Sequence, residues 1–174
     1  YFYNVIMPFL IKAHSTYSYA TTSIITGYCS TLMGGAWIIG GFFSRIMQLN
    51  LTARVKLSTI GALVCSVTML IFSFYVQFNY LVLLIPSFLL LIFIAICFSN
   101  FITLGLNPVR HMAGKANAAM FSIIWVACSI YSGVGALVTS DTLNGIAIGY
   151  VFIVLLLTVF MLTYLKTYAT QTDA

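Results

Sequence analysis

The sequence predicts an all-α fold, a polytopic membrane helix bundle with six transmembrane helices. Of its 174 residues, 62% are hydrophobic and only 5% are charged, and the mean hydropathy is +1.10. A soluble domain carries about 25% charged residues, so a soluble fold is excluded. The apolar segments also recur along the whole chain, which excludes a soluble protein with a single signal or anchor segment. We therefore expect an integral membrane protein.

The first expected helix covers about residues 1–13 and is short. Its apolar run, YFYNVIMPFLI, ends before Lys12. At ~1.5 Å per residue, such a run spans roughly half of a ~30 Å hydrocarbon core. We expect a helix that has lost its leading half, in a chain that belongs to a longer protein. Pro8 removes a backbone hydrogen bond from this helix, and such a kink often borders a cavity.

Five longer apolar segments follow, each of roughly 20 residues or more, as a membrane-spanning helix requires. They are expected at residues 16–43, 55–75, 80–106, 116–139 and 145–165. Short connections join them and carry most of the charge. Pro108 lacks a backbone N–H, so the helix before it is expected to end or bend there.

The charges divide unevenly between the two sides of this arrangement. If the segments cross alternately, Lys12 and Asp141 lie on one side and six of the seven Lys and Arg lie on the other. The positive-inside rule makes the second side cytoplasmic, with both ends of the chain there. Loop cations also account for the net charge of +5 without a nucleic-acid partner. The predicted cytoplasmic anchors are Arg45, Arg54, Lys56, Arg110, Lys115 and Lys166.

Small residues recur at helical spacing in two of the segments. Lipid gives helices little hydrophobic reason to associate, so small residues that allow close approach mark helix interfaces. One stripe runs through the segment at 16–43 and another through the segment at 116–139. Packing or gating roles are predicted for Gly27, Gly34, Gly114, Ala118 and Gly133.

A few larger side chains are candidates for specific contacts. Trp37 is expected in the interfacial belt near the cytoplasmic end of its helix. Trp125 falls near mid-helix, where it either fills a gap between helices or lines a cavity. Asn100 needs hydrogen-bond partners inside the membrane, so it either joins two helices or contacts a ligand. Asn4 raises the same alternatives.

The sequence does not place residues suited to catalysis or metal binding at the spacing that either function needs. No Asp or Glu lies within an expected span, although membrane proton relays usually depend on buried carboxylates. His14 and His111 are expected on opposite sides of the membrane, and the four Cys lie in separate helices. No nucleotide-binding GxxxxGK[ST] segment occurs. We expect neither an enzyme nor a cofactor or metal site.

The run CFSNFITLGLNPVRHMAGKANAAMFSIIWVACSIYSGVGALV, residues 97–138, resembles helices ten and eleven of the major facilitator superfamily. It is most similar to drug-resistance exporters of the Bcr/CflA type, whose eleventh helix starts with a pattern like AGtASAlmG. Here AGKANAAMF stands at 113–121, with Lys115 for Thr, Asn117 for Ser and Phe121 for Gly. The last departure predicts looser or displaced packing at that turn.

Two other stretches fit the same family. MPFLI at 7–11 looks like its seventh helix, and GGFFSR at 40–45 occupies the place of a degenerate loop between helices eight and nine. The resemblance covers nearly the whole chain, as helices seven to twelve. The family's hallmark motifs lie mostly in its N-terminal half, so the match rests on order, spacing and topology together.

The resemblance implies the C-terminal half of a secondary active transporter in a bacterial inner (plasma) membrane. Such a protein would export small amphipathic compounds, drug-like or metabolite, by alternating access, as a proton antiporter with coupling carboxylates in the other half. Its partners would be the lipid bilayer, an N-terminal six-helix half on the same or a separate chain, and the substrate. Aromatic rings and carboxamides suit a mixed small-molecule pocket. The cavity candidates are Tyr1, Tyr3, Asn4, Phe98, Asn100, Phe101 and Trp125.

Two other functions stay open on the sequence. A non-catalytic hydrophobic subunit of a membrane complex would also be apolar and poor in acids. It would need no central polar cavity, and Asn100 would face another helix or subunit. Alternatively, the chain could form a channel or a half-size transporter that works as a homodimer through its exposed central face.

Overall fold

The structure, a computed structural model, describes the backbone of residues 2–75, 80–139 and 143–172, and side chains within 7–75, 84–134 and 144–163 apart from 104, 107 and 108. Every described element is helical, which confirms the all-α prediction. The helices are α1 (Phe2–His14), α2 (Tyr19–Ile46), α3 (Leu51–Tyr75), α4 (Tyr80–Leu106), η1 (Asn107–Met112), α5 (Ala113–Thr139) and α6 (Leu143–Thr172).

Five of these helices are long and apolar enough to cross a membrane. The qualifying stretches are Tyr19–Ile46, Leu51–Tyr75, Leu84–Thr103, Val109–Val134 and Asn144–Thr163. They are consistent with an integral membrane protein. α1 has 13 residues, or about 20 Å of helix at ~1.5 Å per residue.

The helices α2 and α3 extend further into their connection than hydropathy predicts. We expected α2 to end at residue 43 and α3 to begin at residue 55, whereas only residues 47–50 between Ile46 and Leu51 are outside a helix. Arg45 therefore belongs to the last turn of α2 and Arg54 to the start of α3. Arg and Lys are good helix formers, so the helices continue past the point where the apolar stretch stops.

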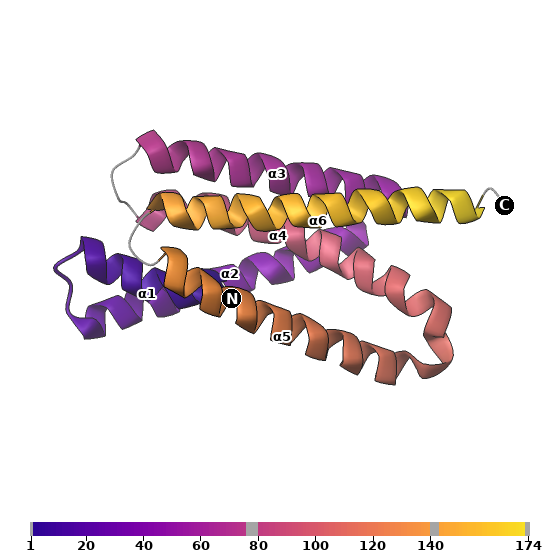
Figure 1. The fold of residues 1–174 in the computed structure, drawn as a ribbon, viewed down its shortest axis with the longest axis horizontal. Helices are drawn as coiled ribbons and strands as arrows, with labels where there is room; N and C mark the ends of the chain where they lie inside the picture. The colour runs from indigo at the N-terminus through magenta and orange to yellow at the C-terminus, as the bar shows by residue number, and fades with distance from the viewer. Residues whose placement is uncertain (1, 76–79, 140–142, 173–174) are drawn as a thin grey trace.

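The α4–α5 connection confirms the role predicted for Pro108. α4 ends at Leu106, and the 3₁₀ helix η1 follows, with Pro108 in its first turn and Val109 at non-helical φ −119° and ψ 32°. Pro is accommodated at the start of a helix because the N–H that it lacks would have no intrahelical partner there. The chain then reverses into α5 (Figure 1).

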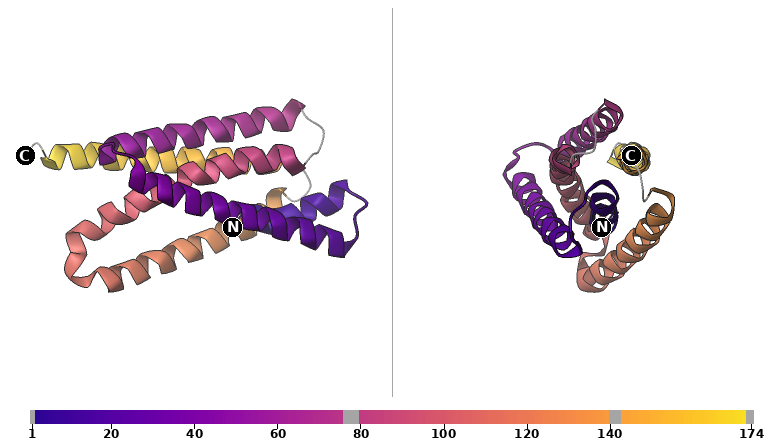
Figure 2. Two further views of the ribbon diagram at one scale, coloured as in Figure 1. Left: turned by 180° about the vertical axis from the view of Figure 1, so that it is seen from behind. Right: turned by 90° about the vertical axis from the view of Figure 1, so that its left-hand side faces the viewer.

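Helix α4 is the centre of the bundle, with α2 and α3 packed along it and α6 packed along α3 (Figures 1 and 2). α1 packs between α2 and α5. The α2–α3 and α4–α5 connections lie at the same end of the bundle, whereas α1 joins α2 at the other end (Figure 1). α5 diverges from α4, and only 6% of its apolar stretch is buried, compared with 39% for α4.

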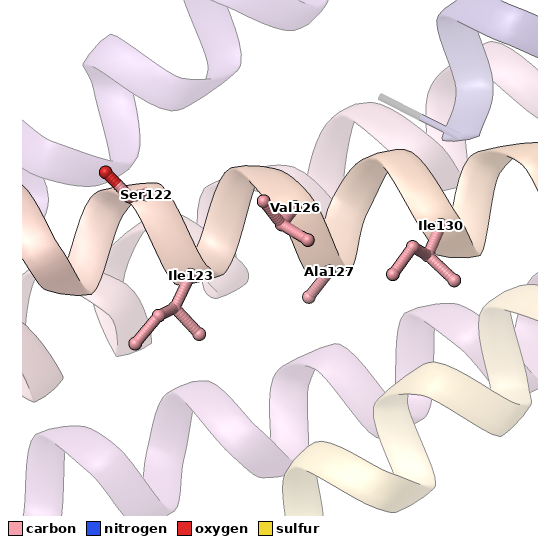
Figure 3. A pocket seen from close by; sticks show the side chains of 5 residues that line it. All are labelled: Ser122, Ile123, Val126, Ala127 and Ile130. Carbon is pink, nitrogen blue, oxygen red and sulfur yellow. The ribbon is translucent and has the colours of Figure 1, made fainter.

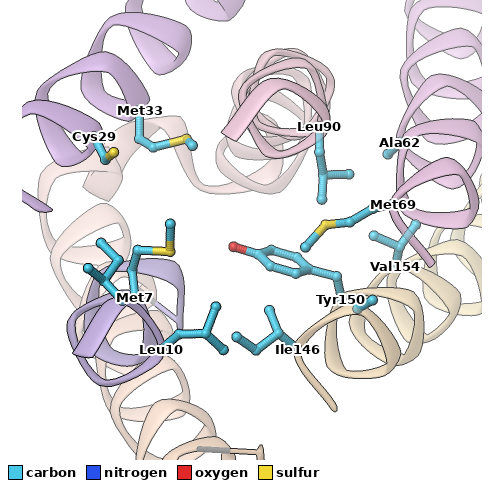
Figure 4. Packing of buried hydrophobic residues seen from close by; sticks show 12 residues of the cluster. Met7, Leu10, Cys29, Met33, Ala62, Met69, Leu90, Ile146, Tyr150 and Val154 are labelled. Carbon is cyan, nitrogen blue, oxygen red and sulfur yellow. The ribbon is translucent and has the colours of Figure 1, made fainter. Parts of the chain in front are cut away.

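The main core lies where α1 meets the other helices, and none of its fully buried members comes from the described side chains of α5, residues 113–134. Figure 4 shows side chains from α1, α2, α3, α4 and α6 converging on a common centre. Thioethers and branched aliphatic groups dominate this core, and both suit irregular gaps between helices. Its members are Met7, Leu10, Ile11, Cys29, Met33, Ala62, Met69, Leu90, Ile146, Ala147, Tyr150 and Val154. A smaller cluster of Val55, Cys97 and Met161 joins α3, α4 and α6.

Two glycines allow α4 to approach its neighbours closely. A Cβ placed on Gly40 of α2 would lie 2.5 Å from the carbonyl oxygen of Ile92 and 2.7 Å from Cβ of Ala95. A Cβ placed on Gly61 of α3 would lie 2.5 Å from the ring of Phe93. Both distances are too short for real atoms, so a residue without a side chain is needed at the α2–α4 crossing and favoured at the α3–α4 crossing.

Candidate functional site

A polar cluster joins α2, α3 and α4 near the end where α2 passes into α3. Asn100 of α4 is only 4% exposed. Its Nδ2 donates to Oγ of Ser44 at 3.2 Å and to the carbonyl oxygen of Ile96, one turn earlier, at 2.7 Å. Ser44 is also buried. The contact is therefore a hydrogen bond between two helices, which is the first of the two roles predicted for Asn100.

Arg54 binds the same serine from α3. Its Nη1 donates to the backbone carbonyl oxygen of Ser44 at 2.9 Å. Ser44 lies in the last turn of α2, where carbonyl groups have no intrahelical donor and the helix dipole is negative. The cation thus caps α2 from the first turn of the next helix. Arg54 was predicted as a headgroup anchor, but its side chain is half-buried and turned toward the bundle.

An aromatic chain connects α2, α4 and α5. Phe98 lies with its ring centroid 5.3 Å from Trp37 and 5.8 Å from Phe121, the second pair edge-to-face. Aromatic pairs at such separations contribute about 0.5–1.5 kcal/mol beyond their buried area. Phe121 was expected to loosen or displace the packing at its turn. The Phe121 ring reaches across to α4 and supplies one of the contacts between α4 and α5, while α5 as a whole diverges from α4, so the expected effect on packing stays a prediction.

The opposite half of the bundle has its own polar contacts. The hydroxyl of Tyr131 on α5 donates to the carbonyl oxygen of Gly149 on α6 at 2.9 Å. The next residue, Tyr150, extends into the core (Figure 4) and has Ser87 of α4 as a hydrogen-bond partner. Ser87 also lies 3.7 Å from the sulfur of Met69 on α3. Four helices are thus linked through hydroxyl groups.

The four predicted cavity residues whose side chains the structure describes contact different neighbours. Asn100 bonds α2, Phe98 bridges α2 and α5, and Phe101 lies 5.7 Å from the ring of Phe160 on α6. Trp125 is 46% exposed on α5. Tyr1 lies outside the described residues, as do the side chains of Tyr3 and Asn4. Substrate binding by these residues stays a prediction.

The predicted packing residues are on exposed faces. A Cβ placed on Gly27, Gly34, Gly114 or Gly133 would meet nothing within 4 Å, and Ala118 is exposed as well. The close approach predicted for them therefore does not occur between the described helices of this chain. Gly40 and Gly61 have that role instead.

A shallow apolar groove of about 370 Å³ lies on α5. All of its lining side chains come from this one helix (Figure 3). They are Ser122, Ile123, Val126, Ala127 and Ile130, and none was predicted as a cavity residue. The hydroxyl of Ser122 bonds the carbonyl oxygen of Ala118 in its own helix, so the groove offers apolar contact area and little polar recognition.

The predicted anchors other than Arg54 are surface residues where the structure describes them. Arg45, Lys56, Arg110 and Lys115 are exposed, and the side chain of Lys166 lies outside the described residues. The chain has two Asp and Glu residues, Asp141 and Asp173, and neither is among the described residues. Nor do three His, Cys, Asp or Glu side chains gather within metal-binding reach in the described ranges.

Comparison of the chain with models of protein families, with curated proteins and with solved structures gives no match. The resemblance to the major facilitator superfamily therefore stays a prediction from the sequence. The chain forms a helical, membrane-type bundle. In it α2 and α3 pack closely along α4, and α5 is loosely attached.

Sequence reasoning missed several of the residues that join the helices. Ser44, Tyr131 and Ser87 are small or aromatic polar residues among many similar ones, and nothing in their spacing distinguishes them. Arg54 offered one signal. It lies three positions after the start of α3 and ten after Ser44, a spacing that can place a cation against the preceding helix terminus when the connection is short.

Proposed function

We propose that the chain is half of a secondary active transporter that exports small amphipathic compounds by alternating access. In this proposal the cation-rich end is cytoplasmic, the membrane is a bacterial plasma membrane, and coupling carboxylates lie outside this chain. The observation that carries the proposal is the exposure of small-residue faces on both α2 and α5, including Gly27, Gly34 and Gly133.

Small residues on an exposed face are informative in a membrane protein. Lipid-facing positions need only apolar side chains, whereas Gly and Ser favour close contact with another helix. On α2 the residues Ser23, Gly27 and Thr31 are exposed on one side, and on α5 the residues Ser129 and Gly133 are exposed. The stripes are therefore available to a second helical body, which in this proposal is the other half of the transporter.

The weak attachment of α5 supports movement at this face. α5 contacts the rest of the bundle through a few points, among them Phe121 with Phe98 and Tyr131 with Gly149. A rocking transporter needs helices that exchange contacts between two states. The core around α4 supplies the rigid part that moves as a unit.

One observation favours a second candidate, a non-catalytic subunit of a membrane complex. Asn100 faces Ser44 of α2 rather than a cavity, as expected for a carboxamide that holds a bundle together. A subunit would also use the exposed stripes of α2 and α5 for assembly. The two candidates differ in whether the protein moves a compound.

The test measures ethidium efflux from cells that produce the complete protein as Gly27→Leu, Gly133→Leu or Val64→Leu. Val64 is 59% exposed on α3, away from the stripes. We expect both glycine variants to be inserted normally and to lose most of the efflux, with Val64→Leu unaffected. If cells with and without the wild-type protein instead show equal efflux of ethidium and of other amphipathic dyes, that result favours the second candidate, a non-catalytic subunit of a membrane complex.

A further inference from the structure

The α2–α3 connection carries more positive charge than the described chain can balance. Arg45 ends α2, Arg54 and Lys56 begin α3, and the four residues between the helices are uncharged. No Asp or Glu occurs within the described ranges. Any counter-ion for this end of the bundle must therefore come from the surroundings or from a segment that is not described.

Of the three cations at this connection, Arg54 is the least exposed to solvent. Its side chain is half-buried, and one N–H group donates to the Ser44 carbonyl oxygen. Its Nε is buried and has no hydrogen-bond partner. A buried donor without an acceptor is costly, more so on a charged group. A guanidinium offers five N–H donors in a rigid fork, and the edge that includes Nε is the one left without an acceptor.

We propose that Arg54 binds the phosphate of an anionic phospholipid, with Arg45 contributing attraction from the end of α2. A guanidinium edge matches two phosphate oxygens through parallel hydrogen bonds. The connection joins two helices that are each long enough to cross a bilayer, so it lies at the level of the headgroups. Basic sites between helices at the cytoplasmic surface are suited to anionic headgroups.

The site would have a structural consequence. The phosphate would occupy the free edge of a guanidinium that already caps α2 through Ser44, and Ser44 bonds Asn100 of α4. The lipid would therefore stabilise the junction of α2, α3 and α4. Nε is buried, so the guanidinium has to pivot about its contact with the Ser44 oxygen, which exposes Nε to the phosphate while Nη1 keeps that hydrogen bond. The proposal depends on a membrane surface at this end and not on transport.

Lys56 provides a charge-matched control. It lies two residues after Arg54 on α3 and is exposed, so its removal lowers the local charge by the same amount. A diffuse attraction of anionic lipid to basic residues would be weakened equally by Arg54→Ala and Lys56→Ala. A site built around the guanidinium would be weakened mainly by Arg54→Ala. Arg54→Lys keeps the positive charge but lacks the forked N–H donors of the guanidinium. It replaces Arg54→Ala as the test variant if Arg54→Ala folds poorly.

The experiment titrates delipidated, detergent-solubilised protein with phosphatidylglycerol or phosphatidylcholine and measures binding by native mass spectrometry and the rise in Tm. A ligand that binds only the folded state raises Tm, and the rise grows with the ratio of free ligand concentration to Kd. We expect phosphatidylglycerol to bind and to raise Tm, and phosphatidylcholine to do neither. We expect Arg54→Ala to weaken phosphatidylglycerol binding about tenfold, Arg54→Lys less, and Lys56→Ala less than about threefold.

Three results would overturn the proposal. Equal weakening by Arg54→Ala and Lys56→Ala would show diffuse attraction, and displacement of the lipid by millimolar inorganic phosphate would show a site for free anions. Lack of any response to phosphatidylglycerol would show that another group balances Arg54. Ethidium efflux is measured separately, so failure of the lipid site would leave the proposed transport function standing, and the reverse also holds.

Discussion

Asn100 of α4 and Ser44 of α2 are joined by a hydrogen bond of 3.2 Å between Nδ2 and Oγ, and both residues are buried. The same serine accepts from Arg54 of α3 through its backbone carbonyl oxygen. One residue in the last turn of α2 thus accepts hydrogen bonds from α3 and from α4. This junction joins the end of α2 both to α4, along which α2 packs, and to the start of α3.

The Asn100–Ser44 pair is expected to contribute modestly to stability. Interhelical hydrogen bonds in membrane proteins average about 0.6 kcal/mol and reach about 1.7 kcal/mol. We expect Asn100→Ala and Ser44→Ala to destabilise the protein, with a coupling energy of about 0.6 kcal/mol in a double-mutant cycle measured by unfolding in mixed micelles. Strictly additive effects of the two substitutions would contradict the bond.

Gly40 is predicted to tolerate no side chain. Gly40→Ala would push Cβ against the backbone of Ile92, which cannot move without shifting α4. Overpacking of this kind costs about 1–3 kcal/mol. The matched control is Gly35→Ala on the same helix, where Cβ meets nothing within 4 Å and helix propensity alone favours Ala by up to about 1 kcal/mol. Thermal unfolding of both variants should show opposite signs.

Gly61→Ala should be milder than Gly40→Ala. The atoms that its Cβ would meet belong to the ring of Phe93, and a side chain can move aside more easily than a backbone. We expect a smaller fall in Tm, and recovery of part of it when Phe93→Leu is added. Destabilisation by Gly61→Ala as large as that of Gly40→Ala would argue against a flexible neighbour.

Phe98 is predicted to hold α5 against α4. Phe98→Ala removes both ring contacts, with Trp37 and with Phe121, each worth about 0.5–1.5 kcal/mol beyond burial. We expect a greater separation of α4 and α5, measured by spin-label distances across the two helices. Phe72→Ala on α3, where the ring is 43% exposed, is the control and should leave that distance unchanged.

Tyr131 is predicted to tie α5 to α6 through its hydroxyl. Tyr131→Phe removes the donor to Gly149 but keeps the ring, so a loss of about 1 kcal/mol is expected. Tyr28→Phe on α2, where the side chain is 71% exposed, provides the control. Hydrogen exchange at the α5–α6 end should increase in the first variant only, and equal exchange in both would contradict the contact.

The helices themselves could be predicted from the sequence, because length and hydropathy are local properties. An apolar stretch of about 20 residues must satisfy its backbone groups internally, and a helix does this within one segment. Pro108 marked the end of α4 for a similarly local reason. The ends of α2 and α3 were less accurate, because charged residues that hydropathy places in a loop continue both helices.

The contacts between helices depended on the tertiary structure. A stripe of small residues shows that a helix face can pack closely, but it does not show which helix lies against that face. Gly27 and Gly34 are exposed, whereas Gly40 packs against α4. The roles of Asn100, Arg54 and Phe121 likewise depend on which helix lies opposite. By itself the sequence determined an acid-poor bundle of membrane-type helices, because the length of an apolar stretch is a property of one segment and does not depend on its neighbours. Only the tertiary structure decided the partners of each polar and aromatic group, since these depend on the rotation and crossing of helices far apart in the chain.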